Sequence, residues 1–497
     1  MKKRVNKENG LCDPELLRHS EIRNGEFVRY QGKAEEVTIP DSVLLISADA
    51  FRGNNRLKRV VIGKNVSVIQ PNAFRDCSQL TEVVFGAELR VIGDDAFRGC
   101  EQLREIDLPD CVTSLGKGCF RGCFALSRVK LPSALSSIGA YAFCECHALL
   151  QIDLPDELLT LNRGVFFQCH ALRQVRVSPE LQSVGRYVFG GCQALEALTL
   201  PDTVTYLGNG ALSECRSLTE FHIPPKVRFV GDYTFACCEK LEKISLPKDI
   251  TYIGINSFCG CFALESIEIP DTLLHVGPEA FLHCKALKTI RLPKSITEIG
   301  KRAFAYCTAL KEVTLDAEVV KVEDECFSSC FSLVKIRLSD SVRKIGVKAF
   351  WRCLGLASVQ FPSELEVIEE YAFSSCESLI EISCPHELKS IKHHAFSNCV
   401  SLQTAILPNR RFFAEPSLFA GCRALKTLVL PDATRLFHYR RELWDVVPRA
   451  EVIGHTELLR ASYTARLKSE DLGETERAEI EDKLKKLRPG KASGYRK

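Results

Sequence analysis

Phenylalanine and cysteine, separated by two residues, recur every 23 residues along most of this chain, without an insertion or a deletion. The series runs from Phe74 and Cys77 to Phe419 and Cys422, and leucines such as Leu57 keep the same period. Fixed periods of roughly 20–50 residues are typical of solenoids, in which one short unit stacks on the next. The chain is therefore predicted to be a stack of coils with one continuous core, and its function is expected on a long surface rather than in a pocket.

The stretch 103–126 shows how one coil is expected to fold. Ile106 and Leu108 alternate with polar residues, which is the period-2 pattern of a strand. Pro109 follows, and proline ends a strand ladder because it has a fixed φ and no N–H. A second apolar pair comes next, and Gly116 after it is interpreted as a turn that needs an unusual φ. The coil is expected to close with a short helical turn that points its phenylalanine and cysteine inward.

The repeat closely resembles the BspA-like (Treponema pallidum type) leucine-rich repeat over about residues 34–431. The shared pattern is Cys-x-x-Leu-x-x-Ile-x-Leu-Pro-x-x-Val-x-x-Ile-Gly-x-x-Ala-Phe. The resemblance implies a repeat solenoid, a right-handed leucine-rich repeat horseshoe or superhelix with a parallel β-sheet on its concave side and short helical or 3-10 turns. It implies no common enzymatic activity. Some members of the family are bacterial or protozoan surface proteins that bind host matrix proteins.

Loss of the period at both ends divides the chain into four segments. We predict an N-terminal cap at 1–33, which includes a strand at Phe27–Tyr30. The solenoid of about 17 coils spans 34–432 and is followed by a C-terminal cap at 433–454. The remaining residues, 455–497, are expected to form a helical tail with a basic end.

The helical prediction for the tail depends on two patterns of side-chain spacing. Glu479 and Lys483, and likewise Asp482 and Lys486, are spaced i,i+4, as are Glu481 and Lys485. An apolar stripe is formed by Ile480, Leu484 and Leu487. The helix either folds onto the cap or binds a partner, and the sequence leaves both readings open.

The 24 cysteines are interpreted as buried, reduced thiols rather than as a disulfide framework. The first residues are basic, but no apolar stretch follows them that would complete a secretory signal. No run approaches the ~18 apolar residues of a membrane span, so membrane insertion is not expected. The protein is expected in the reducing cytoplasm, where disulfides are rare. A formal net charge of +3 over 497 residues gives no general attraction to nucleic acid.

Motifs for catalysis or cofactor binding are not found in the sequence. There is no GxxxxGK[ST] phosphate loop, no complete GxGxxG, no GxSxG elbow and no HExxH. Cys144, Cys146 and His147 resemble part of a metal site, as do Cys259 and Cys261. Each group includes a cysteine of the structural repeat and lacks a second matching pair. We therefore predict no enzymatic activity, no cofactor and no metal.

The positions that alternate with the core residues of each predicted strand are expected to face outward from the concave sheet. These positions are polar, varied and of mixed sign, whereas the core positions hardly change from coil to coil. Such a surface can present a specific pattern to a protein partner, and a glycan is a less favoured partner. The candidate partner-binding residues are Asp107, Lys130, Asp153, Arg173, Arg176, His222, Glu268, Lys288, Arg291, Lys335 and Arg337.

The sequence favours a non-enzymatic scaffold that binds a partner protein over this face by shape and mixed polar contacts. The alternative is a cell-surface or secreted adhesin or effector that binds host or matrix proteins and is exported without an amino-terminal leader. The redox state of the cysteines and exposure to external protease discriminate between the two. The pattern leaves the identity of the partner and the oligomeric state open.

Overall fold

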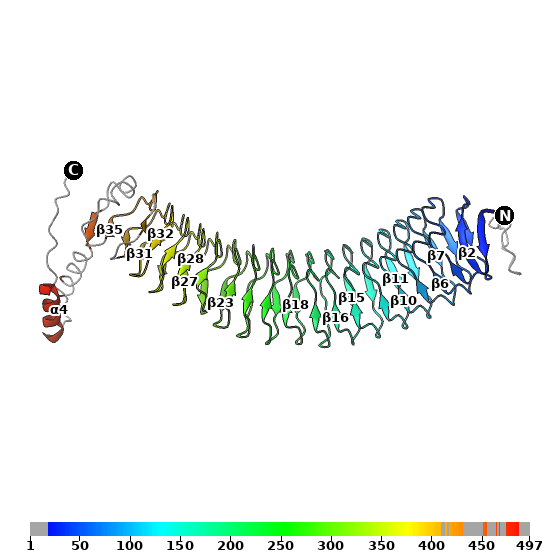
Figure 1. The fold of residues 1–497 in the computed structure, drawn as a ribbon, viewed down its shortest axis with the longest axis horizontal. Helices are drawn as coiled ribbons and strands as arrows, with labels where there is room; N and C mark the ends of the chain where they lie inside the picture. The colour runs from blue at the N-terminus through cyan, green and yellow to red at the C-terminus, as the bar shows by residue number, and fades with distance from the viewer. Residues whose placement is uncertain are drawn as a thin grey trace. The chain divides into compact units, whose positions relative to one another are not determined.

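The computed structural model describes residues 18–408, 413–414, 417–430, 451–454, 464, 467 and 474–486. Contacts divide the chain into two compact units, which we call unit 1 (Met1–Thr272) and unit 2 (Leu273–Lys497). Each unit is a stack of coils, and most coils carry two short strands (Figure 1). The first strand follows the repeat leucine, and the second follows the corner of the coil.

In unit 1 the first strands are β3 (Glu36–Thr38), β5 (Arg59–Val61), β7 (Glu82–Val84), β9 (Glu105–Asp107), β11 (Arg128–Lys130), β13 (Gln151–Asp153), β15 (Gln174–Arg176), β18 (Glu220–His222) and β20 (Lys243–Ser245). The second strands are β4 (Leu45–Ile46), β6 (Val68–Ile69), β8 (Val91–Ile92), β10 (Ser114–Leu115), β12 (Ser137–Ile138), β14 (Thr160–Leu161), β16 (Ser183–Val184), β17 (Tyr206–Leu207), β19 (Phe229–Val230) and β21 (Tyr252–Ile253).

In unit 2 the first strands are β23 (Thr289–Leu292), β25 (Glu312–Leu315), β27 (Lys335–Arg337), β29 (Ser358–Gln360), β31 (Glu381–Ser383), β33 (Thr404–Ile406), β35 (Thr427–Leu430) and β36 (Glu451–Gly454). The second strands are β22 (His275–Val276), β24 (Glu298–Ile299), β26 (Lys321–Val322), β28 (Lys344–Ile345), β30 (Val367–Ile368), β32 (Ser390–Ile391) and β34 (Phe413–Ala414). The helix α4 spans Glu474–Lys486.

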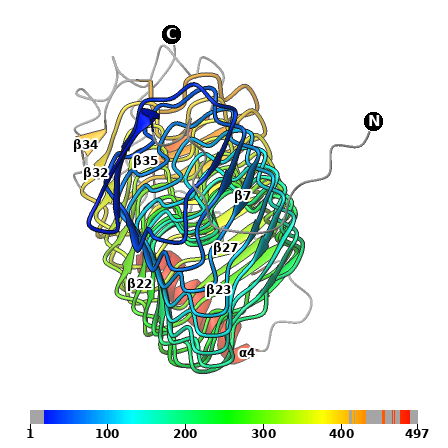
Figure 2. The same cartoon turned by 90° about the vertical axis from the view of Figure 1, so that its right-hand side faces the viewer.

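Neighbouring coils pair in parallel with no change of register, so equivalent positions stack directly on one another. Glu105 lies opposite Arg128, for example, and Thr289 lies opposite Glu312. The predicted parallel sheet is thus present, but its continuity differs between the units. In unit 2 the first strands form one sheet from β23 to β36, whereas in unit 1 they form four shorter sheets. The coils of unit 1 follow the same path when viewed end-on (Figure 2).

A β-hairpin precedes the first coil. Its strands are β1 (Ser20–Arg23) and β2 (Glu26–Tyr30), which pair antiparallel, and β2 then pairs in parallel with β4. The predicted strand at Phe27–Tyr30 is therefore confirmed, but β1 was not predicted. Asn24 and Gly25 connect the strands with positive φ angles of 50° and 78°. Asn-Gly is a strong hairpin signal in a sequence, so β1 could have been found from it.

The recurring phenylalanines form the centre of each unit. Their rings stack from coil to coil with centroid separations of 4.8 Å for Phe51 and Phe74 and 5.5 Å for Phe120 and Phe143. In the hairpin, Phe27 is fully buried and extends the same stack. Offset ring pairs at this separation add stability beyond the area that they bury. Since each ring needs its neighbour, no coil could bury this row alone.

The recurring cysteines have a polar role inside this core. The thiols of these recurring cysteines, the ladder thiols, donate hydrogen bonds to backbone carbonyls of the preceding coil in both units, as Cys100 Sγ does to the Phe74 oxygen at 3.2 Å. The same Phe74 oxygen also accepts the backbone N–H of Cys77. Cysteine is small and apolar enough for the core, yet it supplies a second donor to a buried carbonyl. The predicted burial of the cysteine ladder is confirmed in both units.

The short 3-10-type turns expected at the end of each coil are present, but as a series of single turns rather than as a continuous helix. Residues 93–103 form a series of turns with hydrogen bonds between residues three apart, such as Arg98 N–H to the Asp95 oxygen. Two positions per coil adopt positive φ, here Asp95 at 51° and Gly99 at 73°. These left-handed residues, four apart, prevent the turns from joining into a continuous right-handed helix.

The interpretation of Gly116 as a residue with unusual φ is wrong, because its φ is not positive. A Cβ atom on Gly116 would instead lie 2.4 Å from the carbonyl carbon of Gly93 in the preceding coil. The equivalent Gly139 would meet the backbone of Gly116 and Lys117 at the same distance. Glycine recurs here because the backbones of these neighbouring coils approach closely enough that an added Cβ would force them apart. Other coils carry Gln70 or Asn162 at the equivalent position, so glycine is not required in every coil.

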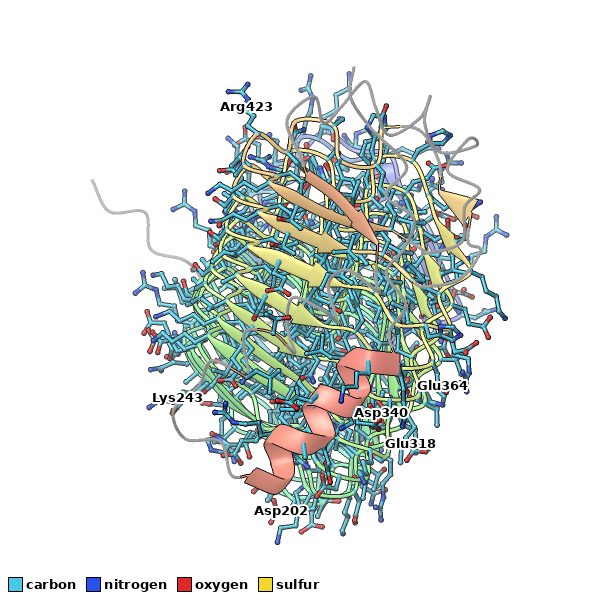
Figure 3. The ribbon with its side chains drawn as sticks, turned by 90° about the vertical axis from the view of Figure 1, so that its left-hand side faces the viewer. Asp202, Lys243, Glu318, Asp340, Glu364 and Arg423 are labelled. Atoms are coloured by element: carbon cyan, nitrogen blue, oxygen red, sulfur yellow. The ribbon has the colours of Figure 1, made fainter. Side chains whose placement is uncertain are left out.

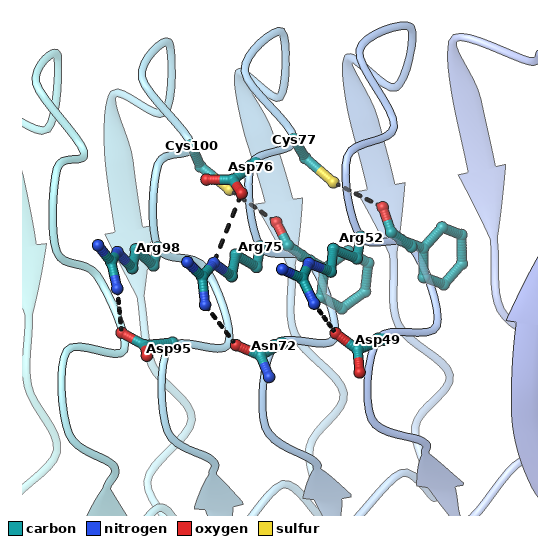
Figure 4. A network of polar contacts seen from close by, with 11 residues as sticks. Asp49, Arg52, Asn72, Arg75, Asp76, Cys77, Asp95, Arg98 and Cys100 are labelled. Carbon is teal, nitrogen blue, oxygen red and sulfur yellow. Dashed lines mark hydrogen bonds and ion pairs between the residues drawn. The ribbon is translucent and has the colours of Figure 1, made fainter.

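In the first coils of unit 1, the residue after the core phenylalanine is an arginine (Figure 4). Arg52 donates to Asp49 at 3.1 Å and Arg75 donates to Asn72 at 3.3 Å. Each acceptor occupies the first left-handed position of its coil, where Asp and Asn are tolerated better than other residues. This row therefore fixes the turns of its own coils, and its charges are largely used in doing so.

Candidate functional site

The candidate site is the strand face, which we define as the side chains at the second, third and fifth positions of each coil, counted from the repeat leucine. In β23 the third and fifth positions, Thr289 and Arg291, are exposed, whereas Ile290 and Leu292 are buried. The same alternation holds at β9 and β27. All eleven residues predicted from the sequence are exposed on this face.

In unit 1 the predicted residues are partly joined by ion pairs between coils. Lys130 Nζ lies 3.4 Å from Asp107, directly across the β9–β11 register. Arg176 Nη1 lies 2.8 Å from Asp156, and its Nη2 donates to the Leu154 oxygen. The hydrogen bond that Arg176 donates to the Asp156 carboxylate raises the pKa of the guanidinium. Arg173 is exposed in the same coil as Arg176, whereas His222 and Glu268 are exposed in other coils of the same unit.

In unit 2 the predicted basic residues lie on one continuous sheet. Arg291 and Arg337 occupy the same row, separated by Thr314 of the intervening strand. Arg291 Nε lies 3.3 Å from Asp316. Lys335, two residues before Arg337, is also exposed. The sequence analysis missed Lys311, which is exposed at the second position of the coil that contains β25 and could have been found from the same 23-residue count.

Two shallow hollows adjoin the strand face, one in each unit. The hollow in unit 1 has a volume of about 670 Å³ and contains Asp153, Asp156 and Arg176 in its lining. The hollow in unit 2 has a volume of about 280 Å³ and is lined partly by Arg337 and Asp340. Both lie where the first strand turns into the corner of the coil. They extend the strand face and bring polar side chains of both signs to it.

The chemistry available to the cysteines is restricted by their burial. Desolvation raises the pKa of the Cys77 thiol to about 12, and it raises that of Cys146 well above its ordinary value. The thiolate is the reactive form of cysteine, so these thiols are poor nucleophiles and poor metal ligands. Among the residues that the structure describes, no three His, Cys, Asp or Glu side chains come together to hold a metal ion.

A second group of surface residues in unit 2 lies away from the strand face, on the turns. Trp351 is flanked by Lys348 Nζ at 5.8 Å and by the Arg352 guanidinium at 5.4 Å from the ring centroid. Arg352 also lies over Phe331, and Lys348 also lies over Tyr371. The sequence analysis did not single out this group, although one of only two tryptophans marks it. These cation–π contacts join three neighbouring coils and are satisfied within the unit.

The helix α4 carries part of the predicted pattern. Ile480 is buried, Leu484 is half-buried, and Asp482 and Lys486 form one of the predicted i,i+4 ion pairs. Leu487 lies outside the described residues. None of the helices in the described ranges has the length and apolar content needed to cross a membrane.

Comparison with solved structures identifies similar folds in bacteria. A leucine-rich repeat protein from Bacteroides ovatus is 24% identical, covers 86% of this chain and 94% of its own, and has a TM-score of 0.50. The leucine-rich repeat protein of T. pallidum is 31% identical over 34% of this chain and 82% of its own, with a TM-score of 0.33. One from Eubacterium ventriosum is 20% identical, covers 75% of this chain and 87% of its own, and has a TM-score of 0.31.

Comparison with curated proteins gave no match. The sequence pattern of the BspA-type leucine-rich repeat region, in contrast, matches residues 20–150, 136–261, 228–357 and 345–439. These matches cover most of the chain and agree with the parallel stacking of 23-residue coils. The chain belongs to the BspA-type leucine-rich repeat family.

Proposed function

We propose that this protein is a non-enzymatic scaffold that binds a partner protein across the strand face. The observation that carries the proposal is the difference between the two sides of each first strand. Inward positions such as Ile290 and Ile336 repeat one type of residue, whereas the outward row changes from Asp107 to Lys130 to Asp153. A fixed backbone with a varied outer row presents a specific pattern of charge without ordering a loop on binding.

The family and the local chemistry support a binding role. Leucine-rich repeat scaffolds of this kind commonly bind proteins. The hollows beside the strand face are shallow and hold mixed charges rather than a nucleophile beside a base. The raised pKa values of the ladder cysteines also remove the recurring cysteine of the repeat from nucleophilic chemistry.

The proposal is tested by charge reversal on the strand face of unit 2. We expect the double variant Arg291→Glu and Arg337→Glu to lose partner capture from an extract of the source cells while its circular dichroism and unfolding curve stay unchanged. The matched control is Arg343→Glu with Arg423→Glu, which makes the same change in net charge at exposed positions outside the strand face. Unchanged capture by the folded strand-face variant would refute this choice of surface.

We also propose that the protein works in a reducing compartment such as the cytoplasm. The support is that the ladder cysteines are used as hydrogen-bond donors, which requires the thiol form. Thiol counting by alkylation, combined with protease treatment of intact source cells, tests this. Protection with nearly all thiols free supports the proposal. Cleavage by external protease or an oxidised ladder would favour the surface adhesin instead, and extracellular matrix proteins would become the first ligands to test.

A further inference from the structure

The strand faces of the two units differ in their balance of charge. In unit 1 acidic residues outnumber basic ones: Glu35, Glu36, Glu82, Glu105, Asp107, Asp153, Glu196, Glu220, Glu242, Glu265 and Glu268 against Lys58, Arg59, Arg104, Arg128, Lys130, Arg173, Arg176 and Lys243. In unit 2 the balance is reversed: Lys288, Arg291, Lys311, Lys335, Arg337 and Lys426 against Glu312 and Glu381. The excess of positive charge in unit 2 is concentrated on β23, β25 and β27 and the residues just before them.

The use of these charges also differs between the units. In unit 1 five of the eight basic residues of the strand face pair with acidic residues of adjacent coils, as in Lys58 with Glu35 at 2.9 Å and Arg59 with Glu82 at 3.0 Å. The other three, Arg104, Arg173 and Lys243, lie dispersed among acidic residues. In unit 2 Lys311, Lys335 and Arg337 form no ion pair with any side chain in the described part of the chain. Their positive charge therefore remains available to a molecule that binds to this face.

From this charge pattern we infer that the partner binds unit 2 through an extended acidic segment of polypeptide that runs along the stack of coils. This inference rests on the proposed function and adds the class of partner. Arg291 and Arg337 lie two rungs apart in one row, which corresponds to about 9.6 Å at the usual strand spacing. In a polyproline II segment, residues three apart share one side and are about 9.3 Å apart. Two carboxylates three residues apart would therefore reach Arg337 directly and Arg291 in exchange for Asp316, which pairs with Arg291 at 3.3 Å.

Apolar side chains beside the basic residues give the partner a second feature. Val334 immediately precedes Lys335 and has 51% of its surface exposed, and Ile380 occupies the equivalent position two coils further on with 51% exposed. Ala357 lies between them in the same row. An acidic segment with apolar residues between its carboxylates would cover this row and pair with the lysines and arginines at the same time.

The surroundings of the basic residues favour polypeptide over nucleic acid. Glu318, Asp340 and Glu364 project from corners of successive coils along one edge of the stack (Figure 3). Asp340 and Glu318 also line the hollow that contains Arg337. A nucleic acid carries a charge at every phosphate and would meet this acidic edge as well as the basic row. A segment with spaced carboxylates can contact the row and leave the edge solvated.

The test uses the full-length protein and synthetic peptides. The probe is a proline-rich peptide with glutamate at every third position and valine among the intervening residues. A peptide of the same composition with its glutamates clustered at one end is the first control, and a single-stranded RNA of equal length is the second. We expect the spaced peptide to bind at least tenfold more tightly than the clustered one, with affinity that falls as salt rises.

The matching protein variants locate the binding. Lys335→Glu with Arg337→Glu is expected to weaken binding of the spaced peptide at least tenfold, whereas Arg343→Glu with Arg423→Glu is expected to leave it unchanged. Equal binding of the two peptides, or tighter binding of the RNA, would overturn the inference. A further pair of results would separate this inference from the proposed function. If the Arg291→Glu and Arg337→Glu variant lost its cellular partner, but neutralising the acidic residues of that partner did not weaken binding, the proposed function would stand. Only the inference of an acidic segment would then be wrong.

Discussion

The inner side and the strand face of each coil are formed by the same short strands, yet their residues follow different rules. Ile106 is buried and Val129 is half-buried, and the two stack on the inner side, where each is constrained by its neighbours above and below. Asp107 and Lys130 stack on the outside of the same two strands at the same spacing, where water replaces half of the neighbours. A change of one inner residue disturbs three coils, whereas a change of one outer residue disturbs at most one ion pair. The constant rows therefore maintain the stack, and the varied rows are left for recognition.

The largest expected effect on the inner rows comes from raising the pH. Burial raises the pKa of the Cys77, Cys123 and Cys330 thiols from 9.0 to about 12. Above pH 9 the unfolded thiols lose their protons while the folded ones keep them, so the unfolded state binds fewer protons and the stability falls as pH rises. Each such thiol should lower the free energy of unfolding by about 1.4 kcal/mol per pH unit in this range.

Urea unfolding followed by circular dichroism from about pH 8 to about pH 10.5 measures this loss. Because many thiols titrate together, we expect the stacks to unfold within this range without urea. Cys146→Ser with Cys169→Ser is the control, since it removes two of the buried thiols and should reduce the slope. If the free energy of unfolding did not change across this pH range, the ladder thiols could not be buried in the protonated form.

The next largest effect is expected from a single ring of the core. Phe120 is fully buried and stacks between Phe97 and Phe143, so Phe120→Ala should lower the free energy of unfolding by about 3–5 kcal/mol. The matched control lies four residues later in the same coil. Phe124 has 40% of its surface exposed and stacks on His147 with ring centroids 4.9 Å apart, so Phe124→Ala should lower the free energy of unfolding by only about 1 kcal/mol. Similar losses for both would mean that the inner and outer rows are not distinct.

A smaller effect on the inner rows should come from Gly116→Ala. The added Cβ would lie 2.4 Å from the backbone of Gly93, so the two coils must separate, at a cost of about 1–3 kcal/mol. Gly53→Asn is the control, because Gly53 has a φ of +70° with open space around it, and asparagine tolerates this conformation. Denaturant unfolding measures both variants. If Gly53→Asn lowered the free energy of unfolding more than Gly116→Ala, backbone φ rather than close approach between coils would explain why glycine recurs at the Gly116 position.

The smallest effect is expected on the strand face. Arg176 and Asp156 form an exposed ion pair, so Arg176→Ala should change the free energy of unfolding by less than about 1 kcal/mol. Its unfolding curve can be measured beside that of Phe120→Ala under identical conditions. A loss comparable to that of the core variant would show that the outer row holds the coils together, and the contrast between the two sides would fail.

The path of the coil could be predicted because it depends on patterns that a sequence displays directly. Alternation of Ile106 and Leu108 with polar residues gives the strand, and a strict period gives the register between coils. The left-handed conformations within the turns could not be predicted in the same way. The positions that adopt them hold aspartate, tyrosine, glutamate and arginine as well as glycine, so no residue type marks them. The stacked neighbours impose these conformations, and only the three-dimensional arrangement reveals that.

For the candidate site, the sequence could predict which side chains are exposed, but it could not predict which charged side chains form ion pairs. Because Arg176 and Arg337 alternate with core residues, the sequence correctly predicted that both are exposed. The acidic partners of Arg176 and Arg291 are Asp156 and Asp316, which come from corners 20 and 25 residues away in the sequence. Which basic residues are neutralised therefore depends on how the corners of adjacent coils lie beside the strands. The difference between paired Arg176 and unpaired Arg337 is the main information that the structure adds.

The S–H groups of the ladder thiols can also be observed directly by infrared spectroscopy in each unit. The S–H stretch absorbs in an infrared window that is nearly free of other protein bands, and it shifts when the thiol donates a hydrogen bond. Ladder sulfurs such as those of Cys123 and Cys353 lie 3.1–3.3 Å from their carbonyl acceptors throughout the described coils of each unit. Their stretches should coincide in one shifted band, and a coil that opens should appear as a separate band from free thiol. Infrared spectra of the unlabelled protein can therefore follow how its coils come apart.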